Sequence, residues 1–329
     1  MSVVVAVLVL VVVPTCALGG TAPTWRSVFS PNTSVVAEAP AAKGVSTLCT
    51  LPYNDTYGIY PAKGGAYVED ATTGWIVFCS KGHGTILDKP PLLYPGYWGM
   101  AGVNVSGTLF LLLSNAVKHG FYYCKGVTPT GVAGCSSFIT LPFPCNVSAT
   151  PYYCPYGIAT DSKLDLYFVA DISSTGASAA PTAIRCTAAS GYSKCTTLYK
   201  FPAHSAPVAI TRYNGNLWYA NDNCTSGAIW ENGILNASFS APLVPPNSAV
   251  TSISWSSAGL SRTPILYVGD SGYWWPMGLY CGFTSFNATV MSVFPFMPQP
   301  TPFVGASIIP GLDAALQFTN GGDKAYKTV

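Results

Sequence analysis

A repeated unit of about 50 residues is the feature that most restricts the fold of this 329-residue chain. Each copy is a short apolar run that contains aromatic residues and ends in Asp or Asn. Clear copies occupy residues 166–171 (LYFVAD), 217–222 (LWYAND), 266–270 (LYVGD) and 316–320 (LQFTN), so their starts lie 51, 49 and 50 residues apart. Two weaker copies begin at Trp75 (WIVFCS) and Leu109 (LFLLLSN). Such a regular period indicates a repeat architecture.

Other short apolar runs surround the clear copies in the same order. A run and a turn come before each copy, as at Asn214-Gly215, a pair that favours a tight hairpin. A third run follows, as in AIRCTA at 183–188, and a fourth ends in proline, as in TTLYKFP at 196–202. Four short strands per unit are typical of a β-propeller blade. A β-sandwich is the alternative, but it does not account for the recurring order of four strands.

The number of units predicts an all-β fold, a six-bladed β-propeller with four-stranded antiparallel blades. The last unit has only three strands, the third being KAYKTV at 324–329. STLCTLPY at 46–53 matches the fourth strands of the other units. We therefore expect an N-terminal strand to close the last blade, which would remove two open sheet edges. The predicted organisation is a signal peptide at 1–19, a tail at 20–43 and a single propeller domain at 44–329.

The first residues predict export. Residues 3–13 are all apolar, and Pro14 and several small residues follow, which is typical of a signal peptide cleaved near Gly19. The run is shorter than the roughly 20 residues that a membrane span requires; whether it is cleaved or kept as an anchor stays open. Seven Asn-X-Ser/Thr sequons agree with a secreted, extracellular or lumenal glycoprotein. They stand at Asn32, Asn54, Asn104, Asn146, Asn223, Asn236 and Asn287.

Composition narrows the classes of function. Charged residues make up 9% of the chain, against roughly 25% in an average soluble domain. With a net charge of +2, the sequence argues against nucleic-acid binding, which requires a basic surface that neutralises phosphates. Hydrophobic residues make up 49%, which argues against disorder. No segment after the signal peptide has the length of a membrane span.

One stretch carries a resemblance to known propellers. Residues 155–171 (PYGIATDSKLDLYFVAD), followed by AIRC at 183–186, are similar to the repeat of the six-bladed NHL, YWTD and SMP-30/gluconolactonase propellers, which are TolB-like. The shared pattern is Gly-Ile-Ala-x-Asp, a turn, Leu-Tyr-x-x-Asp and then Ile-x-Arg. Residues 207–222 (PVAITRYNGNLWYAND) are a second, fair match. The resemblance implies the fold, but the family includes lactonases, lyases, receptors and scaffolds, so it does not define the function.

The cysteines predict disulfides. Ten remain outside the signal peptide, an even number. Two pairs at equivalent positions in neighbouring units predict a hairpin disulfide in each blade, Cys124–Cys135 and Cys186–Cys195. A further pair, Cys145–Cys154, flanks the connection between these blades. The partners of the remaining four stay open: Cys49, Cys79, Cys224 and Cys281. A zinc site is disfavoured, because the sequence has no close C-x-x-C pair.

In a propeller, the connections between second and third strands and those between blades emerge on one face, here called the loop face. Loops on a rigid scaffold usually carry the functional site. Asp171, Asp222 and Asp270 end second strands and are expected there. They could form a ring for a cation such as calcium, but we favour turn-capping, because Asp readily bonds to the backbone of its own turn. We expect the same of the acidic pair Glu69-Asp70, at the end of a predicted inner strand.

The strand order also assigns His83, His119 and His204 to the loop face. A three-histidine zinc site with an open position is catalytic in form, but we favour three solvated loop histidines. The lactonases in the resembling family place a metal-binding acid just before the glycine that opens an inner strand. Here aromatic residues precede those glycines, namely Tyr57, Trp98 and Tyr156. The chain therefore departs from the pattern of that hydrolase.

Aromatic residues are what the loop face offers for binding. They bury much area and keep a polar tip, which suits protein or sugar recognition; packing between blades is the alternative. The candidates are Tyr97, Trp98, Tyr152, Tyr153, Tyr156, Tyr273, Trp274 and Trp275. The sequence thus predicts a secreted binding or scaffold module for a protein or glycan, without a cofactor. A zinc-dependent hydrolase or lyase built on the three histidines at the central channel is the alternative, with zinc or calcium as the metal that could be bound. A purely structural surface or matrix component is a third.

Overall fold

The structure is a computed structural model in which the described elements are β-strands and one 3-10 helix, η1 (Ala188–Ser190). The residues that it describes are 26–29, 45–51, 56–70, 73–89, 97–115, 117–142, 155, 157–170, 181–202, 209–213, 215–222, 226–240, 250–256, 265–270, 277–284, 287–295, 305–308, 316–319 and 324–328. The predicted signal peptide lies outside these residues. None of the described residues forms a helix long and apolar enough to cross a membrane.

Four antiparallel blades follow one another from Thr56 to Ser240, each with its strands side by side in chain order. Blade 1 contains β3 (Thr56–Ala62), β4 (Gly65–Asp70), β5 (Ile76–Ser80) and β6 (Gly82–Asp88). Blade 2 contains β7 (Tyr97–Val105), β8 (Thr108–Asn115) and β9 (Gly120–Lys125), with two short outer pieces, β10 (Gly134–Cys135) and β11 (Ile139–Thr140). Blade 3 contains β12 (Ile158–Thr160), β13 (Leu166–Ala170), β14 (Thr182–Cys186) and β15 (Cys195–Lys200). Blade 4 contains β16 (Ala209–Tyr213), β17 (Asn216–Asp222), β18 (Ser226–Glu231) and β19 (Ile234–Ser240).

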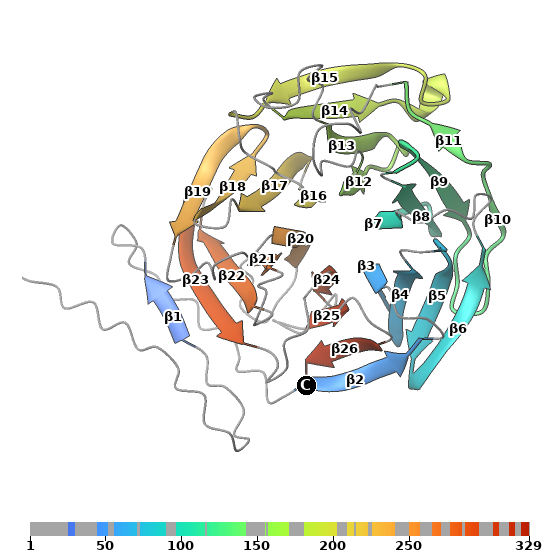
Figure 1. Cartoon of the computed structure of the whole chain (residues 1–329), viewed down its shortest axis with the longest axis horizontal. Helices are drawn as coiled ribbons and strands as arrows, with labels where there is room; N and C mark the ends of the chain where they lie inside the picture. Colours follow the sequence, from blue (N-terminus) through green and yellow to red (C-terminus); the bar gives the residue numbers. More distant parts are fainter. Residues whose placement is uncertain are drawn as a thin grey trace, which may run out of the picture.

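Figure 1 shows these blades around a centre, with the first strand of each blade innermost and the last at the rim. The innermost strands are β3, β7, β12 and β16. This arrangement confirms an all-β, propeller-like fold with four-stranded antiparallel blades.

The remaining strands form two more groups. β20 (Val250–Ser256), β21 (Ile265–Asp270), β22 (Met277–Thr284) and β23 (Asn287–Pro295) pair in chain order, and β1 (Arg26–Phe29) adds to β23. β24 (Gly305–Ile308), β25 (Leu316–Thr319) and β26 (Lys324–Thr328) also pair in order, and β2 (Val45–Thr50) runs antiparallel to β26. The segment predicted as a tail thus contributes one strand. The total of six blades and the closure of the ring stay predictions.

The strand assignment in blade 1 was wrong by one position. The run at Trp75 was interpreted as a second strand, but β5 is the third strand, because β3 and β4 precede it in the sheet. Glu69 and Asp70 therefore end a second strand rather than an inner one. The error arose because β4 and β5 are both almost wholly buried and read as the same apolar run.

Burial explains why the repeat is clearest in the second strands. β4 and β13 are buried on both faces, and their residues are apolar or small except for Glu69 and Asp70 at the end of β4. The outer strand β15 is mostly exposed, and its sequence, CTTLYK, is largely polar. Aromatic rings fill the space between blades: Phe201 makes edge-on contacts with Tyr219 and Trp230, at centroid distances of 5.1 and 5.6 Å. Some of the aromatic residues therefore pack between blades rather than on the surface.

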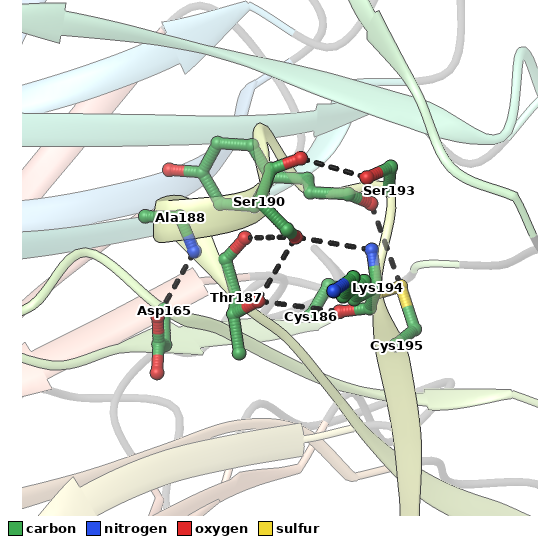
Figure 2. Close-up of a disulfide and its surroundings, with 9 residues drawn as sticks. Asp165, Cys186, Thr187, Ala188, Ser190, Ser193, Lys194 and Cys195 are labelled. Carbon is green, nitrogen blue, oxygen red and sulfur yellow. Dashed lines mark hydrogen bonds between the residues drawn. A yellow bond between two sulfur atoms is a disulfide. The ribbon is translucent and has the colours of Figure 1, made fainter.

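Three disulfides join described strands. Cys124–Cys135 and Cys186–Cys195 link the third strand of blades 2 and 3 to the segment that follows it, as predicted. Figure 2 shows the second of these closing a loop in which the Lys194 amide donates to Ser190 Oγ, at 3.0 Å. Cys145 and Cys154 lie outside the described residues.

A third disulfide, Cys49–Cys79, was not predicted. It ties β2 to β5, with a Cα–Cα distance of 5.5 Å, and both cysteines are fully buried. β2 also runs parallel to β6, where Cys49 is opposite Gly82. β2 also pairs with β26, near the end of the described chain. The disulfide therefore ties the β2–β26 pair to blade 1.

We predict that replacing both Cys49 and Cys79 by Ala lowers the free energy of unfolding more than replacing Cys186 and Cys195. The sequence separations are 30 and 9 residues, and loop-closure entropy gives losses of about 3.6 and about 2.6 kcal/mol, respectively. Urea unfolding followed by tryptophan fluorescence measures both. Equal losses, or a larger one for the short loop, would show that β2 is not held mainly by this bond.

Candidate functional site

The order of the strands within each blade shows which residues lie at the loop face. Second strands end there, so Asp70, Asn115, Asp222 and Asp270 occupy corresponding positions in β4, β8, β17 and β21. Asp171 lies outside the described residues. The side chains of Asp70 and Asn115 are described and fully buried, and their contacts indicate what this repeated position does.

Both described side chains hold the turn that follows their strand. Asp70 Oδ2 accepts hydrogen bonds from the amide and the hydroxyl of Thr73, and the Gly74 amide donates to the Asp70 carbonyl. In blade 2, Asn115 Oδ1 accepts from the Lys118 amide at 2.8 Å. The predicted turn-capping role is therefore confirmed for Asp70, and Asn115, for which no role was predicted, caps the corresponding turn of blade 2.

Glu69 lies beneath this turn, fully buried. A Cβ atom at Gly58 would collide with its carboxylate and with Met100, so the inner strand needs glycine at that position. Burial, and then the charge of Glu69, raises the pKa of Tyr97. The Tyr97 ring contacts Tyr122 edge-on at 5.8 Å, and Tyr122 donates to the Gly74 carbonyl at 2.8 Å. These groups join the turn of blade 1 to the strands of blade 2.

Tyr97 was predicted to bind a ligand, but its side chain is completely buried in this cluster. The prediction does not agree with its position, because a ring with no exposed surface offers no contact area. Trp98 lies in β7, and its side chain is outside the described part, as is that of Tyr57. The remaining candidates lie outside the described residues: Tyr152, Tyr153, Tyr156, Tyr273, Trp274 and Trp275. For these six the expectation is unchanged.

The histidines do not gather where the sequence placed them. His119 is in the connection between β8 and β9, as predicted, with a positive φ of 53°, and its carbonyl accepts from the Leu141 amide at 2.9 Å. His83 is an exposed residue at the start of the outer strand β6, beside the β5–β6 turn and thus on the opposite face. Its predicted place was wrong because β5 is a third strand. His204 lies outside the described residues.

Among the described residues, one group of three potential metal ligands has its atoms within 4.8 Å of one another, Asp88, Cys124 and Cys135. Both cysteines are joined to each other in a disulfide, so their sulfur atoms are not thiolate ligands. Neither His83 nor His119 belongs to such a group.

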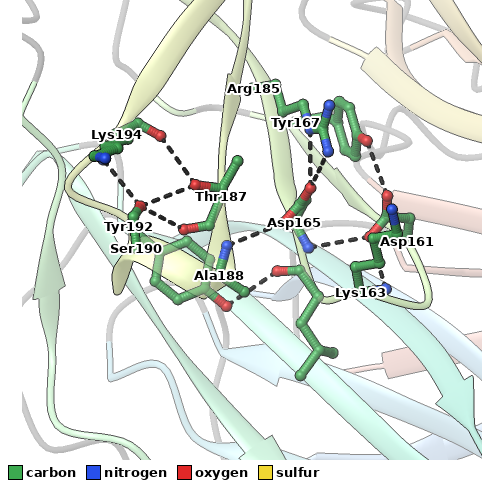
Figure 3. A network of polar contacts seen from close by, with 11 residues as sticks. Asp161, Lys163, Asp165, Tyr167, Arg185, Thr187, Ala188, Ser190, Tyr192 and Lys194 are labelled. Carbon is green, nitrogen blue, oxygen red and sulfur yellow. Dashed lines mark hydrogen bonds and ion pairs between the residues drawn. The ribbon is translucent and has the colours of Figure 1, made fainter.

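The best-matching repeat forms a polar network at the other end of blade 3 (Figure 3). Asp161 Oδ1 accepts from the amides of Lys163 and Asp165, at 2.9 and 3.1 Å, which holds the β12–β13 turn. Asp161 Oδ2 accepts from the Tyr167 hydroxyl at 2.9 Å. Asp165 pairs with Arg185 at 2.5 Å and accepts from the Ala188 amide at 3.0 Å. The Asp and Arg of the family-like pattern are thus structural in this blade.

Two guanidinium groups flank the ring of Tyr167. Arg185, on β14, lies 6.0 Å from the ring centroid, and Arg212, on the first strand of blade 4, lies 5.8 Å from it. Both distances suit cation–π attraction. The sequence analysis did not single out Arg212, although it occupies the run before LWYAND. Only the packing of blade 4 on blade 3 brings it to Tyr167.

One predicted glycosylation site can be examined directly. Asn104 is exposed in the β7–β8 hairpin, and its Oδ1 accepts from the Gly107 amide at 2.8 Å. That bond does not use Nδ2, the atom that carries a glycan. Asn236 and Asn287 lie in β19 and β23, with side chains outside the described part. Asn32, Asn54, Asn146 and Asn223 lie outside the described residues.

These observations define a β-propeller-like protein with capped turns and disulfide-linked blades. No protein-family model matches the chain, and no curated protein does. Two solved structures, both glucose dehydrogenases, are similar to it. One has a TM-score of 0.55 at 9% identity and the other 0.56 at 11% identity; each match covers 87% of this chain and 99% or 98% of the other. Identities this low show the shared fold alone.

We predict that Tyr167 makes the protein less stable in alkali. Burial and the hydrogen bond to Asp161 raise its pKa to about 12. Below the ordinary tyrosine pKa of about 10, neither state ionises. Between pH 10 and 12 the unfolded chain loses a proton that the folded chain keeps, so stability falls by up to about 1.4 kcal/mol per pH unit from this residue.

Urea unfolding of the wild type and Tyr167→Phe between pH 9 and pH 11.5 measures this contribution. The free energy of unfolding should fall less steeply with pH in the variant. An identical slope in both proteins would contradict the raised pKa.

Proposed function

We propose that the chain is a secreted, glycosylated, six-bladed β-propeller, closed by its N-terminal strand β2, that binds a protein or a glycan through its loop face. Two strand arrangements support the ring. β2 lies beside β26 in the position of a fourth strand, and β20–β23 have the same chain order as the four complete blades. Three disulfides support an oxidising compartment.

A binding role is supported above all by the state of the ionisable groups. In the described part of the chain, the carboxylates at Asp70, Asp161 and Asp165 already accept hydrogen bonds from the protein itself. A catalytic acid, base or metal ligand needs lone pairs directed at substrate or metal. Side chains committed to turns instead make a rigid frame, which suits recognition by the loops that it carries.

Metal-dependent hydrolysis or elimination is the second candidate function, and it rests on the position of His119. His119 is the described histidine that remains on the loop face. A site there would need partners from other connections of that face. We rank it second, because the backbone role of His119 accounts for its position without a metal.

The metal hypothesis is tested by elemental analysis of purified protein. We predict less than about 0.1 zinc per chain in both the wild type and His119→Asn. A structural or catalytic zinc site would hold about one zinc per chain. Asn tolerates the positive φ at this position, so the variant should keep its fold. Stoichiometric zinc that disappears in His119→Asn would reject the binding role in favour of the enzyme.

The loop-face hypothesis is tested with two exposed lysines of blade 2. Lys118 lies between β8 and β9 on the loop face, whereas Lys125 ends β9 at the opposite face. Wild type, Lys118→Glu and Lys125→Glu are applied to an array of neutral oligosaccharides and to a panel of secreted proteins. We expect Lys118→Glu to weaken the strongest interaction at least about tenfold, corresponding to 1.4 kcal/mol, and Lys125→Glu to leave it unchanged. The reverse pattern would exclude the loop face.

A further inference from the structure

The face opposite the loop face carries most of the described exposed lysines. It is formed by the turns between first and second strands and between third and fourth strands, and is here called the hairpin face. Its five exposed lysines come from blades 1, 2 and 3, and they are Lys63, Lys81, Lys125, Lys163 and Lys194. Arg185 and Arg212 lie at the same ends of their strands.

The acidic residues at this end of the described blades are already neutralised or bonded. Asp161 and Asp165 are buried, with 6% and 3% of their surface exposed, and they bind the turn amides, Tyr167 and Arg185. Glu231, at the end of β18, accepts from Asn216 Nδ2 at 2.5 Å. The lysines of the hairpin face are therefore exposed, whereas Asp161 and Asp165 are buried. Two half-buried carboxylates stay near this face: Glu231, and Asp88, whose Oδ2 lies 2.9 Å from Cys135 Sγ.

The loop face of the same blades has a different balance. Its exposed lysines are Lys89, Lys118 and Lys200. Asp222 ends β17 at this face, whereas Asp70, at the end of β4, is fully buried and bonded within its turn. In the described blades the hairpin face thus carries five exposed lysines against three on the loop face, which favours a positive local potential on the hairpin face.

Several of these cations are held by ordered backbone. The Lys163 amide donates to Asp161, and the Lys194 amide donates to Ser190 inside the loop closed by Cys186–Cys195 (Figures 2 and 3). Lys125 follows Cys124, whose disulfide fixes the adjacent strand. Arg185 uses Nε and one Nη on Asp165, and three of its five N–H donors stay beyond these two bonds. Such ordering reduces the entropy lost on binding.

We propose that the hairpin face binds an anionic polysaccharide of the sulfated, glycosaminoglycan-like class. The cations are spread over three neighbouring blades, which suits an extended polymer with many charges rather than one small anion. The choice of partner rests on the secreted location proposed above, which the three disulfides support, because sulfated glycans are exposed outside the cell. This surface is distinct from the loop face, so the proposal stands or falls independently of the ligand proposed there.

The test compares two triple variants with the same change in charge. The first replaces Lys125, Lys163 and Lys194 on the hairpin face by Gln. The control replaces Lys89, Lys118 and Lys200 on the loop face by Gln. Both lower the net charge by three and change only exposed lysines, and circular dichroism and thermal unfolding show whether each remains folded. The probe is immobilised heparin, with neutral dextran as the blank, and affinity is measured between 50 and 300 mM NaCl.

We expect wild type and control to bind heparin alike, and the hairpin-face variant to bind at least about tenfold more weakly at the lowest salt. The slope of log affinity against log salt should fall by about 1 for each lysine that contacts an anionic group. Equal weakening of both variants would reduce the effect to net charge and overturn the proposal. Absence of wild-type binding to heparin, with binding to single-stranded RNA or anionic lipid vesicles instead, would overturn the choice of partner.

Glycosylation at Asn104 provides a further check. Asn104 lies in the first hairpin of blade 2, on the hairpin face. A glycan there would cover part of the surface between blades 1 and 3. We expect enzymatic removal of N-glycans, or Asn104→Gln, to increase heparin affinity of the glycosylated protein. A decrease would show that the glycan itself makes the contact, and would contradict a lysine-based site.

Discussion

Every described blade must bury both faces of its sheet, and this requirement organises the rest of the molecule. The second and third strands are apolar on both sides, so a blade alone would expose a large hydrophobic surface. Packing against the next blade removes it, as Phe201, Tyr219 and Trp230 do between blades 3 and 4. The blades are thereby arranged around a centre, and equivalent turns come to lie on the same face.

Polar groups serve this packing. Asp70, Asn115 and Asp161 each hold a tight turn by accepting backbone amide hydrogens close to the buried strands. An unbonded amide there would cost free energy, because it is shielded from water. Few charged residues are present, and many of the carboxylates that the structure describes are used in this way. Carboxylates such as Asp161 and Asp165 are buried where they hold turns, so lysines are the main exposed charges on the hairpin face of the described blades.

The two faces of the disc therefore have different chemical character. The loop face carries turn-capping side chains at the ends of second strands, as Asp70 and Asn115 show. The hairpin face carries short, tightly bonded turns and exposed cations, three of them close to a disulfide or to the Asp161–Asp165 network. The two partners proposed above, one for each face, would therefore not compete for the same surface.

The sequence alone determined the all-β class, the four-strand unit and two disulfides, because these depend on local order: a turn pair such as Asn214-Gly215, an apolar run, and cysteines on adjacent strands. It failed where two runs look alike, as in blade 1, where both β4 and β5 are buried and the third strand was interpreted as the second. For this reason His83 was predicted on the loop face but lies on the opposite one. Tyr97, predicted to bind a ligand, is buried. Tertiary structure alone decided that Cys49 meets Cys79 and that Arg212 meets Tyr167, because both contacts join strands from different parts of the chain. The face that a side chain occupies depends on whether its strand is the first, second, third or fourth of the blade. Only the pairing of the strands in space determines that order.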